Sequence, residues 1–219
     1  MKIYITRHGQ VLPQKFYLDV QFPAGDESIS ALGKEQAKYL GEHLKSIGFN
    51  GKIYSSPYIR TLETAEIIAS YTGSEIIPWA PVREIMRDKE ELKEFKGLTL
   101  LEIKERFKFI KKDSSLSYPW WSQTLETVED VKVRVAKGLE ELELKEDVLF
   151  VGHGASVAGL CTHLKITKEN KRACNCSLST IDSENKTKPV FADTAFLPYK
   201  MRSYNSVMLW EEEEKPSSI

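Results

Sequence analysis

Apolar residues along this chain fall into two alternating kinds of segment. Short apolar runs bounded by turn-forming residues are typical of buried strands, and they occur at residues 2–6, 52–56, 75–79, 147–154, 176–184 and 188–196. Longer segments repeat apolar residues every three or four positions, as on one face of a helix, at 31–48, 57–73, 127–143 and 155–164. This alternation predicts an α/β fold with a mainly parallel sheet.

The ends of the expected helices are marked by residues that favour helix termini. Ser30 and Thr127 are suited to cap a first turn with their hydroxyl groups. Pro57 favours a helix start, since a first-turn residue needs no backbone N–H. Gly48 and Gly73 can adopt the left-handed conformation that closes a helix. These signals place the helix boundaries between the strands.

Residues 82–123 interrupt the alternation. A charge-rich stretch over 83–97 is followed by a short amphipathic helix pattern over 98–107, and then by a polar loop that contains Trp120 and Trp121. We expect this region to be an insertion or lid over the strand ends. The two tryptophans either line the mouth of a pocket for an organic group or pack within the lid.

The composition narrows the class of protein. The 219 residues suit a single domain over 1–210, followed by an acidic tail at 211–219 that we expect to be disordered. The 31 Lys and Arg residues balance 32 Asp and Glu, which argues against a nucleic-acid or membrane-surface binder. No apolar run approaches the roughly 20 residues of a membrane-spanning helix, and the N-terminus lacks a signal peptide's apolar core. We therefore expect a cytoplasmic protein.

The cysteines predict neither disulfides nor a metal site. Cys161, Cys174 and Cys176 are an odd number in a chain of this size, which is no disulfide framework. The Cys174–Cys176 pair has no second pair to complete a tetrahedral zinc site. We expect it to lie along the strand at 176–184 as packed side chains. The sequence thus predicts no metal and no cofactor.

Three short motifs carry residues that can bind an anion. Arg7 and His8 end the first strand, where a plain turn is the alternative. Arg60 lies in a first helical turn, where free N–H groups favour anions, although an exposed arginine is the alternative there. His153 lies between two glycines, Gly152 and Gly154, that allow close backbone approach, and helix N–H groups follow immediately; a strand-to-helix turn in which His153 caps or packs is the alternative. Ligands of parallel sheets bind at the carboxyl ends of the strands, so both histidines should meet at one edge.

Taken together, these motifs resemble those of the histidine phosphatase superfamily, the phosphoglycerate mutase-like proteins of branch 1. The matching stretches are "TRHG" at 6–9, "SSPYIRTLETA" at 55–65 and "GHG" at 152–154, with weaker matches at 26–37, 124–135, 175–181 and 191–197. The resemblance covers most of the chain and is weakest over 82–123. It implies a three-layer α/β/α fold and a phosphoryl-transfer activity without a cofactor.

The resemblance also implies roles for individual residues. His8 would be the nucleophile that forms a phosphohistidine. Arg7, Arg60 and His153 would surround the phosphoryl group and stabilise its charge. Gly154 would allow the backbone to approach the phosphate. Gln14, which stands where the family often has Asn, could donate an N–H to it.

A general acid must protonate the leaving alkoxide. The family places a carboxylate after the third strand, which corresponds to Glu84 here. In the family a glycine-containing stretch soon follows this carboxylate, but here the glycine, Gly97, lies further along the chain. Glu91 and Glu94 therefore remain alternatives for the acid.

Three functions are compatible with these residues. The first is a metal-independent phosphatase that acts on a small phosphorylated metabolite, as a monomer or homodimer. The second is phosphoglycerate mutase-type phosphoryl transfer. Arg83 and Arg87 could meet a second anionic group on a substrate, and a solvated charge is the alternative for both. Gln10, where mutases are often acidic, and Gln14 favour hydrolysis. The third is a silent binding module, against which the presence of Arg7, His8, Arg60 and His153 argues. The identity of the phosphoester stays open.

Overall fold

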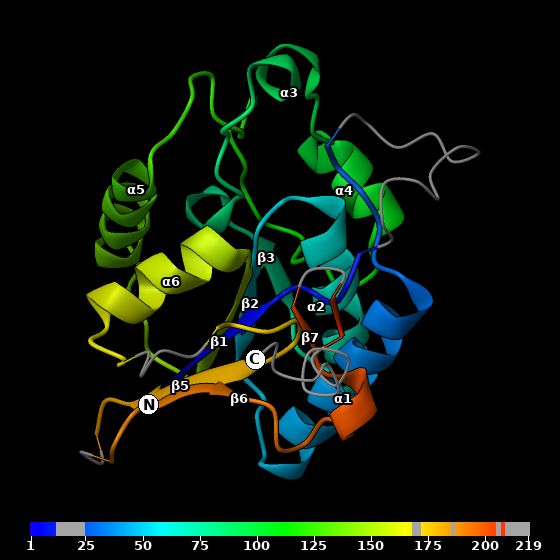
Figure 1. Ribbon diagram of the computed structural model, residues 1–219, viewed down its shortest axis with the longest axis vertical. Helices are drawn as coiled ribbons and strands as arrows, with labels where there is room; N and C mark the ends of the chain where they lie inside the picture. The colour runs from blue at the N-terminus through cyan, green and yellow to red at the C-terminus, as the bar shows by residue number, and fades with distance from the viewer. Residues whose placement is uncertain (12–24, 168–171, 185–186, 205–206, 209–219) are drawn as a thin grey trace, which may run out of the picture.

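The computed structural model confirms an α/β fold (Figure 1). It describes residues 1–11, 25–167, 172–184, 187–204 and 207–208. Gln14 and the acidic tail at 211–219 lie outside the described residues. Among the helices that the structure describes, none combines the length and apolar character needed to span a bilayer.

A six-stranded sheet forms the centre, in the order β3-β2-β4-β1-β5-β6. The strands are β1 Lys2–Arg7, β2 Lys52–Ser55, β3 Ile76–Pro78, β4 Val148–Gly152, β5 Leu178–Asp182 and β6 Val190–Asp193. The first four strands in that order run parallel, and β5 and β6 are antiparallel additions at the edge. The carboxyl ends of β1 and β4 therefore lie side by side.

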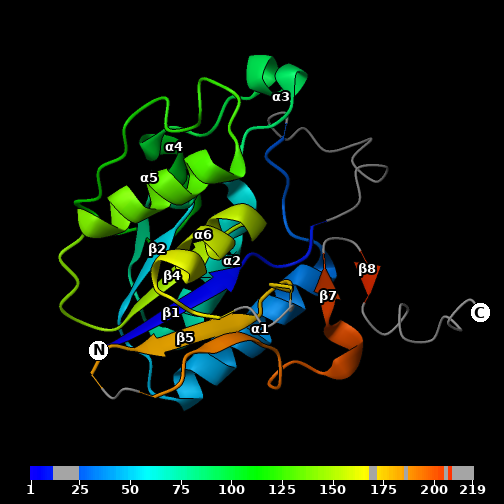
Figure 2. The ribbon, with the colours of Figure 1, turned by 60° about the vertical axis from the view of Figure 1, so that its left-hand side comes forward.

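Helices cover both faces of this sheet (Figures 1 and 2). On one face lie α1 Ala31–Ser46, α2 Ile59–Thr72 and α4 Leu100–Arg106, and on the other lie α5 Val128–Glu140 and α6 Gly154–His163. The smaller elements are α3 Lys89–Glu94, the 3₁₀ turns η2 Ala80–Val82 and η3 Tyr199–Met201, and the hairpin β7 Ser203–Tyr204 and β8 Val207–Met208. The expected three-layer α/β/α arrangement is thus confirmed.

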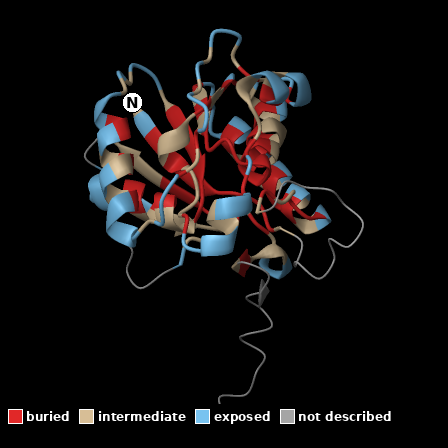
Figure 3. Ribbon diagram, turned by 90° about the horizontal axis from the view of Figure 1, so that it is seen from above, coloured by how far each residue is buried: buried red, intermediate tan, exposed pale blue. Residues whose placement is uncertain are grey.

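Alternate residues of the central strands enter the two opposite cores, as the pleat of a strand requires. Tyr4 and Leu149 pack with α1, α2 and α4, whereas Ile5 and Phe150 pack with α5 and α6. Figure 3 shows this burial concentrated in the strands and on the inner helix faces. A sheet buried on both faces is a rigid support for groups at its edge.

Most of the predicted helix ends are confirmed. The Ser30 and Thr127 side chains accept hydrogen bonds from their own first turns, and Gly48 and Gly73 have φ of 78° and 74°. The prediction that Pro57 opens the second helix is wrong, because Tyr58 is extended and the helix begins at Ile59. A distant carboxylate, described below, fixes this start, and no local pattern reveals it.

Residues of the region over 82–123 pack into two clusters of the fold. Its helix α4 belongs to the helix layer, since Ile103 and Phe107 are buried in the core beneath α1 and α2. Met86, Phe95 and Trp120 of this region form an aromatic cluster with Tyr58, which precedes α2. Trp120 is buried, and its indole N–H donates to the Leu98 carbonyl at 2.8 Å. For Trp120 the packing alternative is therefore correct.

The cysteines differ from the expectation in one respect. Cys174 and Cys176 lie in the turn before β5, where Cys176 has φ of 53°, and do not alternate along the strand. All three cysteines of the chain are described as buried thiols outside any disulfide. They pack as apolar side chains.

Candidate active site

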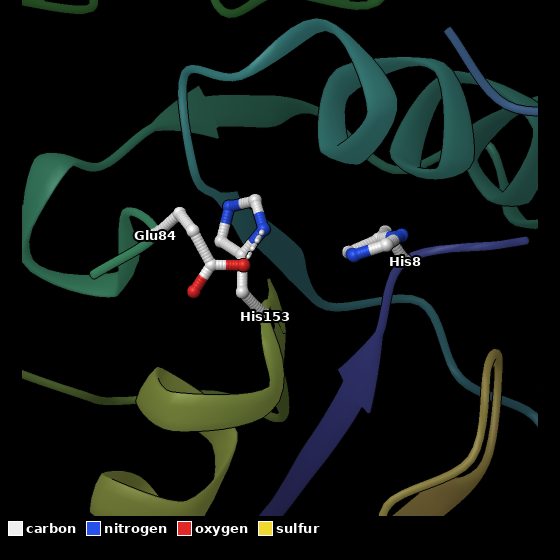
Figure 4. A group of neighbouring side chains, drawn as sticks. All are labelled: His8, Glu84 and His153. Carbon is white, nitrogen blue, oxygen red and sulfur yellow. Dashed lines mark ion pairs between the residues drawn. The ribbon is translucent and has the colours of Figure 1, made fainter. Parts of the chain in front are cut away.

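The parallel pairing of β1 and β4 brings the two predicted histidines together. Arg7 pairs with Gly152 in register, and the His8 amide donates to the Gly152 carbonyl at 3.0 Å. The rings of His8 and His153 lie 5.2 Å apart between centroids, with Glu84 beside them (Figure 4). Two residues separated by most of the chain thus form one site, as strand topology predicts.

His8 is held in a defined protonation state. Its Nδ1 lies 2.7 Å from the Gly9 carbonyl oxygen, which only accepts, so Nδ1 carries the proton. Burial lowers the pKa of His8 well below its ordinary value, and Arg7 and Arg60 lower it further. The ring is therefore neutral near pH 7, and its Nε2 has a free lone pair.

The loop that presents His8 is fixed by neighbouring elements. The Gly9 amide donates to Thr64 Oγ1 of α2 at 3.0 Å, and Asn175 Nδ2 donates to the His8 carbonyl at 3.0 Å. A side chain on Gly9 would place a carbon 2.5 Å from the Gly33 carbonyl oxygen of α1. Glycine is required here because the backbones of the loop and of α1 touch. Gly9, Thr64 and Asn175 all lie in the stretches that match the family, but sequence reasoning assigned no role to Thr64 or Asn175.

His153 is fully buried and has one unsatisfied ring nitrogen. Its Nε2 lies 2.9 Å from Ser56 Oγ, and its ring packs against Tyr58 at 5.0 Å between centroids. Its Nδ1 makes no hydrogen bond and lies 3.4 Å from Glu84 Oε2. Burial lowers the pKa of His153 well below its ordinary value, with Arg60 adding to the effect. A buried nitrogen that faces a carboxylate without a hydrogen bond is the kind of group found at catalytic sites.

Arg60 supplies a buried positive charge next to the histidines. It is the second residue of α2, and its guanidinium lies 4.5 Å above the centroid of the Tyr58 ring. Nη1 lies 3.3 Å from both Glu27 Oε2 and the Gly25 carbonyl, and Nη2 lies 3.6 Å from Glu84 Oε2. Burial alone would lower the pKa of Arg60, but these carboxylates raise it above its ordinary value.

Arg7 supplies the second charge. It ends β1, is 7% exposed, and lies with its guanidinium carbon 4.9 Å from the centroid of the Tyr204 ring. Burial lowers the pKa of Arg7, yet a guanidinium keeps its proton throughout the physiological range. A methyl group on Gly154 would lie 3.9 Å from this guanidinium carbon, so Gly154 borders the site as expected.

The structure separates the three candidates for the general acid. Glu84 lies within 3.4 to 3.6 Å of His153 and Arg60. Glu91 is half-buried on α3 and Glu94, at the end of that helix, is exposed. Of the three, Glu84 is the carboxylate in contact with His153.

Other polar residues suggested by the sequence have different surroundings. The Gln10 backbone anchors the start of α1 by accepting from the Ser30 amide at 2.7 Å and donating to Gln36 Oε1 at 2.9 Å. Arg83 donates to Glu126 at 2.9 Å, and Arg87 is exposed. Gln10 thus helps to set the position of α1, and the charge of Arg83 is matched by Glu126.

The side chains could offer ligands to a cation, but their surroundings favour an anion. His8, Glu84 and His153 present ligand atoms within 4.8 Å of one another. Arg7 and Arg60, both almost fully buried, add two positive charges to the same space. Like charges repel strongly where solvent is excluded. The arrangement therefore suits a tetrahedral oxyanion such as phosphate.

Asp26 is a buried carboxyl group that holds the start of α2. It is fully buried, and its Oδ1 accepts from the Ile59 amide at 2.6 Å, while its Oδ2 has no hydrogen-bond partner. This is the distant cap that makes α2 begin at Ile59. Burial raises the pKa of Asp26 to about 7, although Arg60 and the Ile59 amide lower it.

We predict that Asp26→Asn stabilises the protein above neutral pH. The folded-state pKa is raised from 3.8 to about 7, so the folded chain binds the extra proton and loses stability as pH rises between these values. Asparagine keeps the acceptor without the charge. Between pH 5 and pH 8 the stability gain of the variant should grow by about 2–3 kcal/mol, as measured by urea unfolding.

The exposed Asp113→Asn is the control for this prediction. Asp113 pairs with Lys111 at the surface, and this hydrogen bond lowers its pKa. No gain with rising pH is expected from that variant. A gain for Asp26→Asn that is equal at pH 5 and pH 8 would contradict the titration and indicate improved packing.

Comparison with known proteins agrees with this geometry. The family described as "Histidine phosphatase superfamily (branch 1)" matches residues 3–192. A protein named "Probable phosphoglycerate mutase GpmB" from Salmonella arizonae is 28% identical over 187 residues, which cover 83% of this chain and 85% of the relative.

Solved structures share the fold. An ecdysone phosphate phosphatase from Bombix mori has a TM-score of 0.67 at 16% identity, covering 97% of this chain and 99% of that one. A phosphoserine phosphatase from Entamoeba histolytica has a TM-score of 0.58 at 20% identity, covering 90% and 99%. With the family match over nearly the whole chain, this protein belongs to the histidine phosphatase superfamily, branch 1.

Proposed function

We propose that the protein is a metal-independent phosphomonoesterase that works through a phosphohistidine on His8. The observation that supports this most directly is the hydrogen bond from Nδ1 to the Gly9 carbonyl. It leaves the Nε2 lone pair of a neutral ring available for attack on phosphorus. Phosphatases and a probable mutase among the similar proteins are consistent with this class of reaction.

The proposed reaction has two displacements. In the first, His8 Nε2 forms a bond to phosphorus while the ester P–O bond breaks, and Glu84 gives its proton to the leaving oxygen. In the second, Glu84 accepts a proton from water, whose oxygen attacks phosphorus and breaks the P–N bond. The products are the alcohol and inorganic phosphate, and both side chains return to their starting state.

The positive groups would stabilise the charge on the transferred phosphoryl oxygens. Arg7 and Arg60 both lie close enough to lower the pKa of His8 and His153, and both keep their charge when buried. The unsatisfied Nδ1 of His153 is a further group that a phosphoryl oxygen could meet. Because these groups are already in place, little reorganisation is needed when charge develops.

The second candidate is phosphoglycerate mutase activity, which the name of the Salmonella relative favours. A mutase must bind a second anionic group of its substrate while the phosphoryl group stays on the enzyme. Of the basic residues that could meet such a group, Arg83 already donates to Glu126, and Arg87 is exposed. Glu27 adds a further carboxylate on Arg60. Both observations favour hydrolysis over transfer to a second phosphorylated alcohol.

We expect the purified protein to release phosphate from p-nitrophenyl phosphate at an unchanged rate in EDTA. The described site presents two guanidinium groups for the phosphate, so chelation should remove nothing that the reaction needs. Interconversion of 2- and 3-phosphoglycerate without net phosphate release would instead support the mutase. Loss of activity in EDTA with recovery on adding a divalent cation would contradict the proposed mechanism.

A further inference from the structure

Arg60 binds a second carboxylate that the proposed reaction does not use. Glu27, in the segment before α1, places Oε2 3.3 Å from Nη1, while Glu84 lies 3.6 Å from Nη2 of the same guanidinium. The Arg60 side chain is 8% exposed, but those of Glu27 and Glu84 are 26% and 25% exposed. Both carboxylates therefore lie on the solvent side of a buried charge.

The unsatisfied nitrogen of His153 indicates where a ligand lies relative to these carboxylates. His153 is fully buried, and its Nδ1 makes no hydrogen bond and faces Glu84 at 3.4 Å. The phosphoryl group belongs among the histidines, and the ester oxygen belongs at Glu84, which must protonate it. The organic part of the ester then extends outward past Glu27, which lies at Nη1 of Arg60, whereas Glu84 lies at Nη2.

The surrounding charges add to the effect of Glu27. Glu91 of α3 lies against Gly25, since a methyl group there would be 2.7 Å from Glu91 Oε1. Burial raises the pKa of Glu91, with Arg60 lowering it and Glu27 raising it, so these groups lie close enough to interact.

We infer that Glu27 is a specificity-determining residue that selects against phosphomonoesters carrying a second anionic group beside the ester. Its carboxylate repels a carboxylate or second phosphate there and attracts an ammonium group. The preferred substrates are thus small phosphate esters with a cationic or neutral neighbouring group, such as an aminoalkyl phosphate. This inference rests on the proposed phosphatase function.

Three esters that differ in one group test the inference: 2-aminoethyl phosphate, ethyl phosphate and phosphoglycolate. We expect kcat/KM of the wild type to fall in that order. In Glu27→Gln, the ratio of kcat/KM for 2-aminoethyl phosphate to that for phosphoglycolate should fall roughly tenfold, as expected for one charge pair at a partly exposed site. Ethyl phosphate carries no charged group beside the ester, so its kcat/KM shows any general effect of the substitution on Arg60.

The control is Glu90→Gln, which removes the same charge from an exposed position on α3 that pairs with Lys93. The ratio should not change in this variant. An unchanged ratio in Glu27→Gln, or an equal fall in both variants, would overturn the inference. If Glu27→Gln does not fold, as judged by circular dichroism, Glu27→Ala replaces it with the same expectation.

Failure of the proposed function can be told apart from failure of the inference. If no ester and no p-nitrophenyl phosphate is hydrolysed, the phosphatase proposal fails. Calorimetric binding of the same three esters to the wild type and to Glu27→Gln then tests the charge preference alone. The same order of affinity, lost in the variant, supports the inference, and equal affinities overturn it.

Discussion

Replacing His8 with alanine should abolish both phosphate release and phosphorylation of the protein. The variant removes the Nε2 lone pair that would attack phosphorus in the proposed reaction. We expect kcat to fall by roughly 10⁴-fold or more, as for other catalytic nucleophiles. Rapid quenching after mixing with radiolabelled substrate measures the acid-labile phosphohistidine directly.

The matched control is His163→Ala, since His163 is the exposed last residue of α6. That variant should keep full activity and full labelling. Thermal unfolding of His8→Ala shows whether the buried ring is needed for folding. If a folded His8→Ala protein still becomes labelled with phosphate, the nucleophile is another residue and the proposed mechanism is wrong.

Replacing Glu84 with glutamine should slow the reaction of esters with poor leaving groups far more than the reaction of esters with good ones. An alkoxide must be protonated as it leaves, whereas p-nitrophenolate leaves without a proton. Loss of a general acid typically costs about 10²–10⁴-fold, so we expect that loss for ethyl phosphate and a much smaller one for p-nitrophenyl phosphate. Single-turnover rates of enzyme phosphorylation measure both effects.

Glu91→Gln and Glu94→Gln provide the comparison. Glu94 is exposed and Glu91 lies against Gly25, so neither is placed to reach the leaving oxygen as Glu84 is. In each variant, the rate of enzyme phosphorylation should change by the same small factor for ethyl phosphate and for p-nitrophenyl phosphate. If the dependence on leaving group appears in Glu91→Gln and is absent in Glu84→Gln, the general acid is Glu91.

Local sequence patterns were sufficient to predict an α/β fold and the convergence of the histidines, whereas the three layers were expected from the family resemblance. The apolar runs around His8 and His153 identify buried strands, and parallel strands must end at a common edge. The helix caps at Ser30 and Thr127 follow from short-range chemistry. These features depend on neighbours within a few residues, or on a topology with few alternatives.

Other parts of the site depend on contacts between distant segments. Asp26 sets the first residue of α2, and Glu27 binds Arg60, although more than thirty residues separate them in the chain. Ser56 and Asn175 reach His153 and His8 in the same way. No periodicity or spacing predicts such pairs, because each requires the packed positions of two elements.

Tyr58 packs against both His153 and the aromatic cluster and so connects the two. Its ring contacts His153 on one side, and Phe95 and Trp120 of the region over 82–123 on the other. Opening the aromatic cluster would move Tyr58 away from the His153 ring. Water would then reach a ring that is buried and neutral. We therefore expect the amides of that cluster and of the site to exchange with solvent as one cooperative unit, slowed together by a bound oxyanion.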